Sequence, residues 1–251
     1  MLRKAVFLCG TLLLVASASA FAFDPIDLTG GGTVTSTVDQ TIWSSNITQP
    51  TGTGVYQPFL RIQASNNEEG FNTDFSTPFP LDDKPPINFT HSVTWGSLAT
   101  INISGTDYYS FQLDANEPQD KTESLISLDK LRIYNSTDPA LQTLSGLGNP
   151  LYDLDGSSDQ TIYIDTALKP GSGTDDLTLY IPKSFFANVN PNDYMVFYTQ
   201  FGLSEADAGL ATGATFEEWR AVQNSDVPEP TTMVLLGGGL LGMAGFRRKK
   251  K

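Results

Sequence analysis

The sequence predicts an all-β protein: a sandwich or jelly-roll-like domain with one short C-terminal helix, flanked by a signal peptide and a C-terminal membrane tail. Short runs of alternating apolar and polar residues recur at intervals of roughly 10 to 20 residues, separated by Gly, Pro, Asn and Asp. The one cysteine, Cys9, lies in the leading apolar segment, so a core instead of disulfides must stabilise the rest. About 200 residues remain between the terminal segments, which is enough for one domain.

The strands are expected where alternation with a period of two residues is clearest. Phe59 to Ala64, for example, places Arg61 and Gln63 on one face. The other expected strands are Thr33–Val38, Gln40–Trp43, His91–Trp95, Leu98–Ile103, Tyr108–Leu113, Leu125–Tyr134, Gln160–Asp165, Leu177–Ile181 and Tyr194–Phe201. The stretches 66–86 and 135–159 are rich in turn residues and are interpreted as loops.

Two short helical pieces are expected. Pro182 to Phe186 can form one turn after a strand. The segment Thr215–Val222 (TFEEWRAV) begins with a threonine that is followed three residues later by Glu218, the capping-box pattern of a helix N-terminus. Its aromatic residues would then pack on the end of the β-domain.

Residues 1–22 have the pattern of a secretory signal. Arg3 and Lys4 precede an apolar core, and Ala20-Phe21-Ala22 is a small-x-small cleavage site. Cleavage by signal peptidase after Ala22 would leave an ectodomain over residues 23–222 and a linker over residues 223–226.

Residues 227–251 form a tail of three parts: Val227, Pro228, Glu229 and Pro230, an apolar stretch at 231–246, and five basic residues that begin with Arg247 and Arg248. The prolines hold Glu229 extended and outside any helix. As a helix the apolar stretch would span about 24 Å, short of the ~30 Å hydrocarbon core. The basic residues should stay on the cytoplasmic side. An ordinary C-terminal anchor and a GPI signal are the alternatives, although a GPI signal normally ends in apolar residues.

This order of parts resembles the PEP-CTERM sorting signal of Gram-negative bacteria. The resemblance implies recognition by exosortase, transient anchoring in the inner membrane, removal of the tail, and a final place at the cell surface or in the extracellular matrix. Five segments of the ectodomain also resemble, in the same order, a recurrent all-β ectodomain of PEP-CTERM proteins. They are residues 54–63, 70–74, 108–114, 126–134 and 215–219. This second resemblance implies location and architecture only.

The charge is concentrated in the ectodomain. All 28 acidic residues lie between Asp24 and Glu229, against eight basic residues there, which leaves a formal charge of about −20. Such a surface repels nucleic acid and attracts cations. Asp153, Asp155 and Asp159 fall within one tight turn that could bind Ca²⁺, the one cofactor that the sequence suggests. A solvated acidic turn is the simpler interpretation.

Groupings typical of catalysis are scarce. There is one histidine, His91, and no cysteine after the signal, so neither a transition-metal site nor a Cys-His pair can be assembled. No G-x-S-x-G motif occurs. Glu217 and Glu218 are adjacent carboxylates, but helix capping explains them better than glycoside hydrolysis does. We therefore expect a structural, non-enzymatic protein of the extracellular matrix or biofilm, associated with exopolysaccharide.

A glycan-binding, lectin-like module is the alternative function. Its candidate stacking residues are Trp43, Trp95, Trp219, Tyr108 and Tyr109. An enzyme that acts on polysaccharides is a third and weaker alternative.

Overall fold

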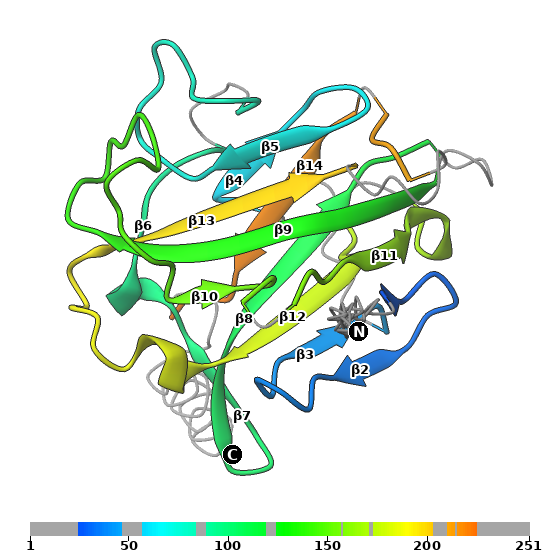
Figure 1. Ribbon diagram of the computed structural model, residues 1–251, viewed down its shortest axis with the longest axis horizontal. Coiled ribbons are helices and arrows are strands. Elements are labelled where there is room, and N and C mark those ends of the chain that lie inside the picture. Colours follow the sequence, from blue (N-terminus) through cyan, green and yellow to red (C-terminus); the bar gives the residue numbers. More distant parts are fainter. Residues whose placement is uncertain are drawn as a thin grey trace, which may run out of the picture.

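Two β-sheets of seven strands each lie face to face in the computed structural model, and the strands of one sheet cross those of the other at an angle (Figure 1). The structure describes residues 25–46, 57–83, 89–118, 124–156, 158–170, 173–202, 210–213 and 215–224. The signal peptide, with Cys9, and the tail, with Val227–Pro230, the apolar stretch, Arg247 and Arg248, lie outside the described residues.

Sheet I has the strand order β1-β11-β9-β13-β5, with β10 beside β9 and β6 beside β13. All of its pairs are antiparallel except β1 with β11. Its strands are β1 (Ile26–Asp27), β5 (Glu68–Phe71), β6 (Val93–Thr94), β9 (Leu125–Ser136), β10 (Tyr152–Asp153), β11 (Ile162–Asp165) and β13 (Tyr194–Phe201).

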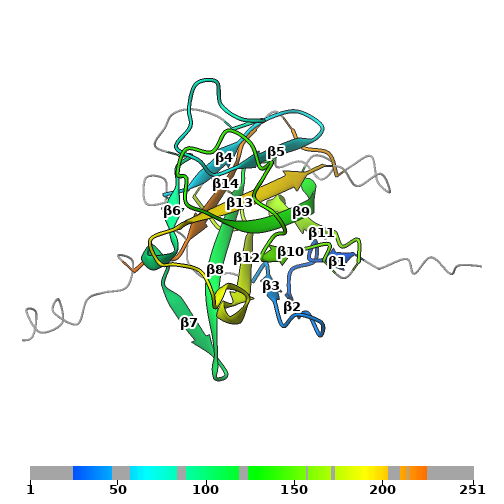
Figure 2. The same cartoon turned by 60° about the vertical axis from the view of Figure 1, so that its left-hand side comes forward.

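Sheet II has the order β2-β3-β12-β8-β14-β4, with β7 beside β8, and is wholly antiparallel. The β7–β8 hairpin projects from the body of the protein (Figure 2). The strands of sheet II are β2 (Thr33–Thr35), β3 (Ile42–Ser44), β4 (Leu60–Ile62), β7 (Thr100–Ile103), β8 (Thr106–Ala115), β12 (Leu177–Pro182) and β14 (Glu217–Ala221). Short 3₁₀ turns occur at η1 (Trp95–Ser97), η2 (Thr166–Leu168) and η3 (Lys183–Phe186).

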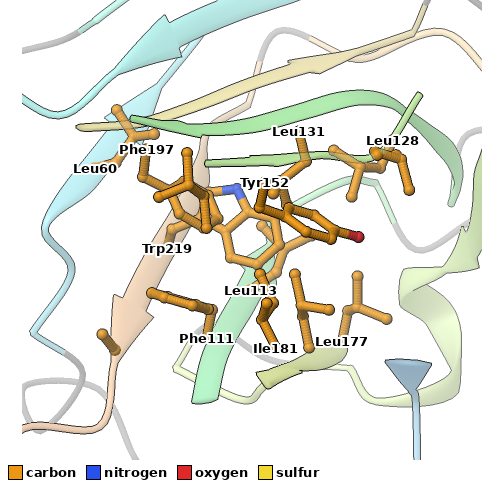
Figure 3. Close-up of a cluster of buried hydrophobic side chains, with 14 of the residues drawn as sticks. Leu60, Phe111, Leu113, Leu128, Leu131, Tyr152, Leu177, Ile181, Phe197 and Trp219 are labelled. Atoms are coloured by element: carbon orange, nitrogen blue, oxygen red, sulfur yellow. The ribbon is translucent and has the colours of Figure 1, made fainter. Parts of the chain in front are cut away.

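The core lies between the sheets because each long strand turns alternate residues inward. Trp219 of β14 contacts Phe197 of β13, with ring centroids 4.9 Å apart, and so joins the two sheets near the centre of the core (Figure 3). The other side chains labelled in this core view are Leu60, Phe111, Leu113, Leu128, Leu131, Tyr152, Leu177 and Ile181.

The all-β prediction is confirmed, and ten of the fourteen strands overlap segments that were expected to be strands. The expected turn after β12 is the 3₁₀ turn η3. The predicted helix over Thr215–Val222 is wrong, because Glu217–Ala221 is strand β14. This strand is hydrogen-bonded to β8 on one side and β4 on the other, and that pairing outweighs the local capping pattern.

Two pieces of sheet lie in stretches interpreted as loops. β5 is part of the polar stretch 66–86, and β10 is part of the turn-rich stretch 135–159. In addition, Asn224, within the predicted linker, remains bonded to the domain: its N–H donates to the carbonyl of Ser97 (2.9 Å) and its side chain to the carbonyl of Gly96 (2.9 Å).

Candidate functional site

A row of four side chains crosses the outer face of sheet I, set by the strand register. Asp153 of β10 lies opposite Arg132 of β9. Arg132 in turn lies opposite Tyr198 of β13, and Tyr198 lies opposite Phe71 of β5. Because successive strand residues face opposite sides, these four share the face directed away from the core. The row therefore combines a carboxylate, a guanidinium group and two aromatic rings.

Two loops flank this row and leave a cavity of about 450 Å³. One loop follows β5 and the other follows β9 (Figure 1). The loops are tied together, since the Asp74 N–H donates to the carbonyl of Pro139 (2.8 Å) and the Thr73 hydroxyl donates to the carbonyl of Leu141 (2.8 Å). The described residues that line the cavity are Glu69, Phe71, Pro80, Leu81, Arg132, Tyr134, Gln142, Thr143, Leu144, Ser145 and Tyr198.

The apolar part of the cavity belongs to a small second core outside the main one. Its buried members are Phe71, Tyr134, Val196 and Tyr198, and the loop residues Leu141, Leu144 and Leu147 pack against them. The loop after β9 is thus held over the sheet by its leucines, whereas its polar residues Gln142, Thr143 and Ser145 stay exposed.

The polar part of the cavity is held in place by hydrogen bonds. The Tyr198 hydroxyl donates to Glu69 Oε2, and Gln200 Nε2 donates to the same oxygen (3.4 Å). Glu69 itself is fixed at its backbone, because its N–H donates to Asp82 Oδ2 (3.0 Å). Burial, and then the hydrogen bond to Glu69, raise the pKa of Tyr198, so its hydroxyl stays a neutral donor.

Arg132 is held by the turn that the sequence suggested as a calcium site. Its Nε donates to both carboxylate oxygens of Asp153 (3.1 Å each), and its terminal nitrogen lies 3.9 Å from Asp155. A guanidinium group held by two carboxylates keeps a fixed plane, with donors left for a ligand. The pairing therefore presents Arg132 to the cavity in one orientation.

Two of the three predicted calcium ligands are engaged with Arg132. Asp153 and Asp155 are turned to Arg132, and Asp155 Oδ1 also accepts a hydrogen bond from the Gln160 N–H (3.2 Å), while Asp159 is exposed. Within the described ranges, no three His, Cys, Asp or Glu side chains are grouped so as to hold a metal ion.

The aromatic residues that the sequence suggested for sugar stacking are buried. Trp43, Trp95, Trp219, Tyr108 and Tyr109 are all at most 6 % exposed, and all but Tyr108 belong to the main core. The aromatic residues of the cavity, Tyr134, Tyr198 and Phe71, were missed. One signal in the sequence could have pointed to them. In the alternating segment of β9, Arg132 and Tyr134 are two residues apart and so lie on the same face of the strand, the one opposite the main core.

This arrangement suits the binding of a neutral, hydroxyl-rich molecule. The cavity is within the usual size range of small-molecule sites, roughly 300 to 1,000 Å³. Glu69 offers acceptor oxygens, Arg132 offers donors, and Gln142, Thr143 and Ser145 offer both. Phe71, Tyr134 and Leu144 provide apolar surface beside them.

Comparison with known proteins bears on the tail. Residues 226–249 match the PEP-CTERM protein-sorting motif family. No curated protein and no solved structure matches the chain significantly. The chain thus carries the PEP-CTERM sorting motif predicted from its tail, which marks it as an exported, exosortase-targeted protein sorted to the cell surface. In the part of the chain that the structure describes, no helix is long and apolar enough to cross a membrane.

Proposed function

We propose that this protein is a non-enzymatic carbohydrate-binding protein of the extracellular matrix, and that the sheet I cavity binds a segment of exopolysaccharide. The observation that carries the proposal is the cavity itself, in which apolar rings and a fixed set of donors and acceptors converge on about 450 Å³. Export by the sorting motif would bring this cavity to the polysaccharide outside the cell.

The chemistry of the lining supports a sugar ligand. A pyranose ring has apolar C–H faces and a rim of hydroxyl groups, so it needs apolar contact and directional hydrogen bonds together. Tyr134 and Leu144 supply the first, and Glu69 and Arg132 supply the second. Because Glu69 and Arg132 are already held by Tyr198 and Asp153, binding would order few additional side chains.

Binding is favoured over hydrolysis by the number of carboxyl groups. Glycosidases generally use two carboxyl groups on opposite sides of the scissile bond. Among the described residues that line the cavity, Glu69 is the single carboxylate, since Asp153 and Asp155 pair with Arg132 and do not line the cavity. This supports a role in holding polysaccharide, as expected of a matrix or biofilm protein.

Affinity electrophoresis in gels that contain the exopolysaccharide of the producing cells tests the proposal. Ser145→Trp places an indole at the cavity from an exposed loop position. The variant should bind the polysaccharide at least tenfold more weakly, so the retardation seen for the wild type should be lost. Ser184→Trp, an equally exposed serine in η3, is the matched control and should leave binding unchanged. Equal retardation of both variants and the wild type would contradict the assignment of the cavity.

A further inference from the structure

Three glutamate side chains meet between the two sheets at the end where β5 and β14 come close. Glu68 comes from β5 in sheet I, Glu217 from β14 in sheet II, and Glu117 from the residues just after β8. They are 1 %, 0 % and 3 % exposed, respectively. Glu217 lies within hydrogen-bonding reach of both others. A carboxyl cluster therefore takes the place of apolar core at this end of the protein.

Two of the three side chains also anchor the backbone. Glu117 accepts the Gly213 N–H with both carboxylate oxygens (2.9 and 2.8 Å), and Glu68 Oε2 accepts the Ala64 N–H (2.8 Å). By contrast, Glu68 Oε1 and both oxygens of the fully buried Glu217 accept no N–H or hydroxyl donor. A carboxyl proton is the group that can satisfy these oxygens, by bonding one carboxyl group to another.

The charges that face the cluster are all negative. Glu68 faces Glu217, Glu117 and Asp82, while Glu217 faces Glu68 and Glu117. The neighbouring cations point to the other side of sheet II and are already paired there, Arg61 with Glu218 and Arg220 with Asp175. Three ionised carboxylates buried together without a cation would repel one another strongly.

We propose that Glu68 and Glu217 share a proton that links the two sheets, and that loss of this proton as the pH rises loosens β5 from β14. The pair thus forms a pH-sensitive latch that is closed in acidic surroundings and weakened in alkaline ones. Its effect would reach the outer face of sheet I, because Glu69, the next residue of β5, lines the cavity there.

The direction of the effect follows from proton linkage. Burial raises the pKa of Glu68 from 4.5 to about 7, and burial and then the bond to Glu68 raise the pKa of Glu217 well above its usual value. The folded protein therefore retains protons that the unfolded chain loses once the pH exceeds 4.5. The stabilisation from the shared proton is complete below that pH and decreases as the pH rises through about 7.

Urea unfolding of the exported protein between pH 5 and pH 9 tests the latch. The unfolding constant of the wild type should rise by up to about tenfold per pH unit for each carboxyl group of the pair that stays protonated in the folded protein. Glu217→Gln replaces the protonated acid by a neutral group of the same shape, so it should remove the part of the slope that Glu217 contributes and leave the part that burial of Glu68 causes. Other buried acids, such as Asp114 and Asp176, remain in both proteins and cancel in the comparison.

Glu218→Gln is the matched control, since the adjacent side chain faces the opposite side and pairs with Arg61. Because burial also raises the pKa of Glu218, the comparison is made above pH 7, where this variant should keep the wild-type slope even if its stability is lower at every pH. Identical slopes for Glu217→Gln and the wild type would overturn the proposal. Recovery of the alkaline stability by added CaCl₂, but not by MgCl₂ at the same concentration, would also overturn the proposal. A metal ion and not a proton would then balance the charge of the cluster.

Hydrogen exchange of the wild-type protein gives a second readout, which does not depend on the folding of any variant. After correction for the intrinsic pH dependence of exchange, the amides of β5 and β14 should open more readily above pH 7 than at pH 5, and those of β3 and β12 should not. Equal pH dependence of the opening equilibria across these strands would also overturn the latch.

Discussion

Gly70 lies where the strands of the two sheets leave no space for a side chain. A Cβ atom built there would overlap Asp83 Oδ1 and Ile62 Cγ2, and both of these side chains are buried. The position belongs to β5, whose next outward residue, Phe71, borders the cavity. A small residue at position 70 therefore keeps β5 close to β4 while the outer face carries the binding groups.

Gly70→Ala should consequently destabilise the protein by about 1 to 3 kcal/mol, the usual cost of overpacking a core. Gly30→Ala is the control, because a Cβ at Gly30 has no atom within 4 Å, and it should change stability by less than about 0.5 kcal/mol. Urea midpoints of the two variants give the comparison. A Gly70→Ala protein as stable as Gly30→Ala would show that β4 and β5 pack more loosely than described.

Arg132 shows what the sequence can and cannot say at the scale of one residue. The alternation of Leu125 to Tyr134 predicted a strand, and in the structure Arg132 and Tyr134 of this strand line the outer cavity. The acidic turn at Asp153 and Asp155 was also recognised, but as calcium ligands. The pairing of β9 with β10 brings the turn to Arg132, and this register depends on contacts that the local sequence does not contain.

At the scale of elements, β14 is the clearest case in which packing overrides a local signal. The segment TFEEWRAV fits a helix cap, yet it also alternates, with Glu217, Trp219 and Ala221 inward and Glu218 and Arg220 outward. A helix would expose part of Trp219, whereas the strand buries the whole side chain against Phe197 and Phe201. Burial of an indole outweighs the ~1 kcal/mol of a capping interaction.

Hydrogen exchange can verify this placement of β14. Its amides should exchange among the slowest in the protein, because β14 lies between β8 and β4. The amides of β2, an exposed edge strand of the same sheet, should exchange at least a hundredfold faster, which corresponds to about 2.7 kcal/mol in opening free energy. Exchange of the 217–221 amides as fast as that of β2 would contradict the strand assignment.

β5 escaped prediction for a different reason. Its sequence, Glu68-Glu69-Gly70-Phe71, has two charges and a glycine, all unfavourable for a strand in isolation. Each residue has a place only in the assembled protein: Glu68 in the carboxyl cluster, Glu69 in the cavity, Gly70 against Ile62 and Phe71 beneath the outer loops. A strand whose polar residues serve two sites cannot be recognised by its hydrophobic pattern.

At the scale of the whole molecule, the architecture was predictable and the binding surface was not. Alternation over many short segments was enough to predict an all-β domain, and the lack of cysteine after the signal was enough to predict that a sizeable core stabilises it. The cavity depends instead on Glu69, Arg132 and Tyr198, from three strands far apart in sequence, and on two loops that cross one end of the sheet. None of these has a local motif.

The sorting motif predicts a covalent change. Exosortase processing near Glu229 should remove the apolar stretch and the basic residues, so the extracellular protein should lack residues 231–251. Intact-mass spectrometry of the protein from the medium measures this directly. A Glu229→Ala variant, compared with Asp107→Ala in the exposed β7–β8 hairpin, should keep the full tail and remain with the cells. Full-length chain in the outer fraction would contradict processing at this motif.

The central claim, that the outer cavity of sheet I binds carbohydrate, is tested most directly by NMR titration. Oligosaccharides prepared from the exopolysaccharide of the producing cells would be added to the ¹⁵N-labelled exported protein. We predict shifts confined to Glu69, Arg132, Tyr134, Tyr198 and the loop 142–145. Saturating shifts confined to the outer face of sheet II, or no shifts at millimolar oligosaccharide, would contradict the account.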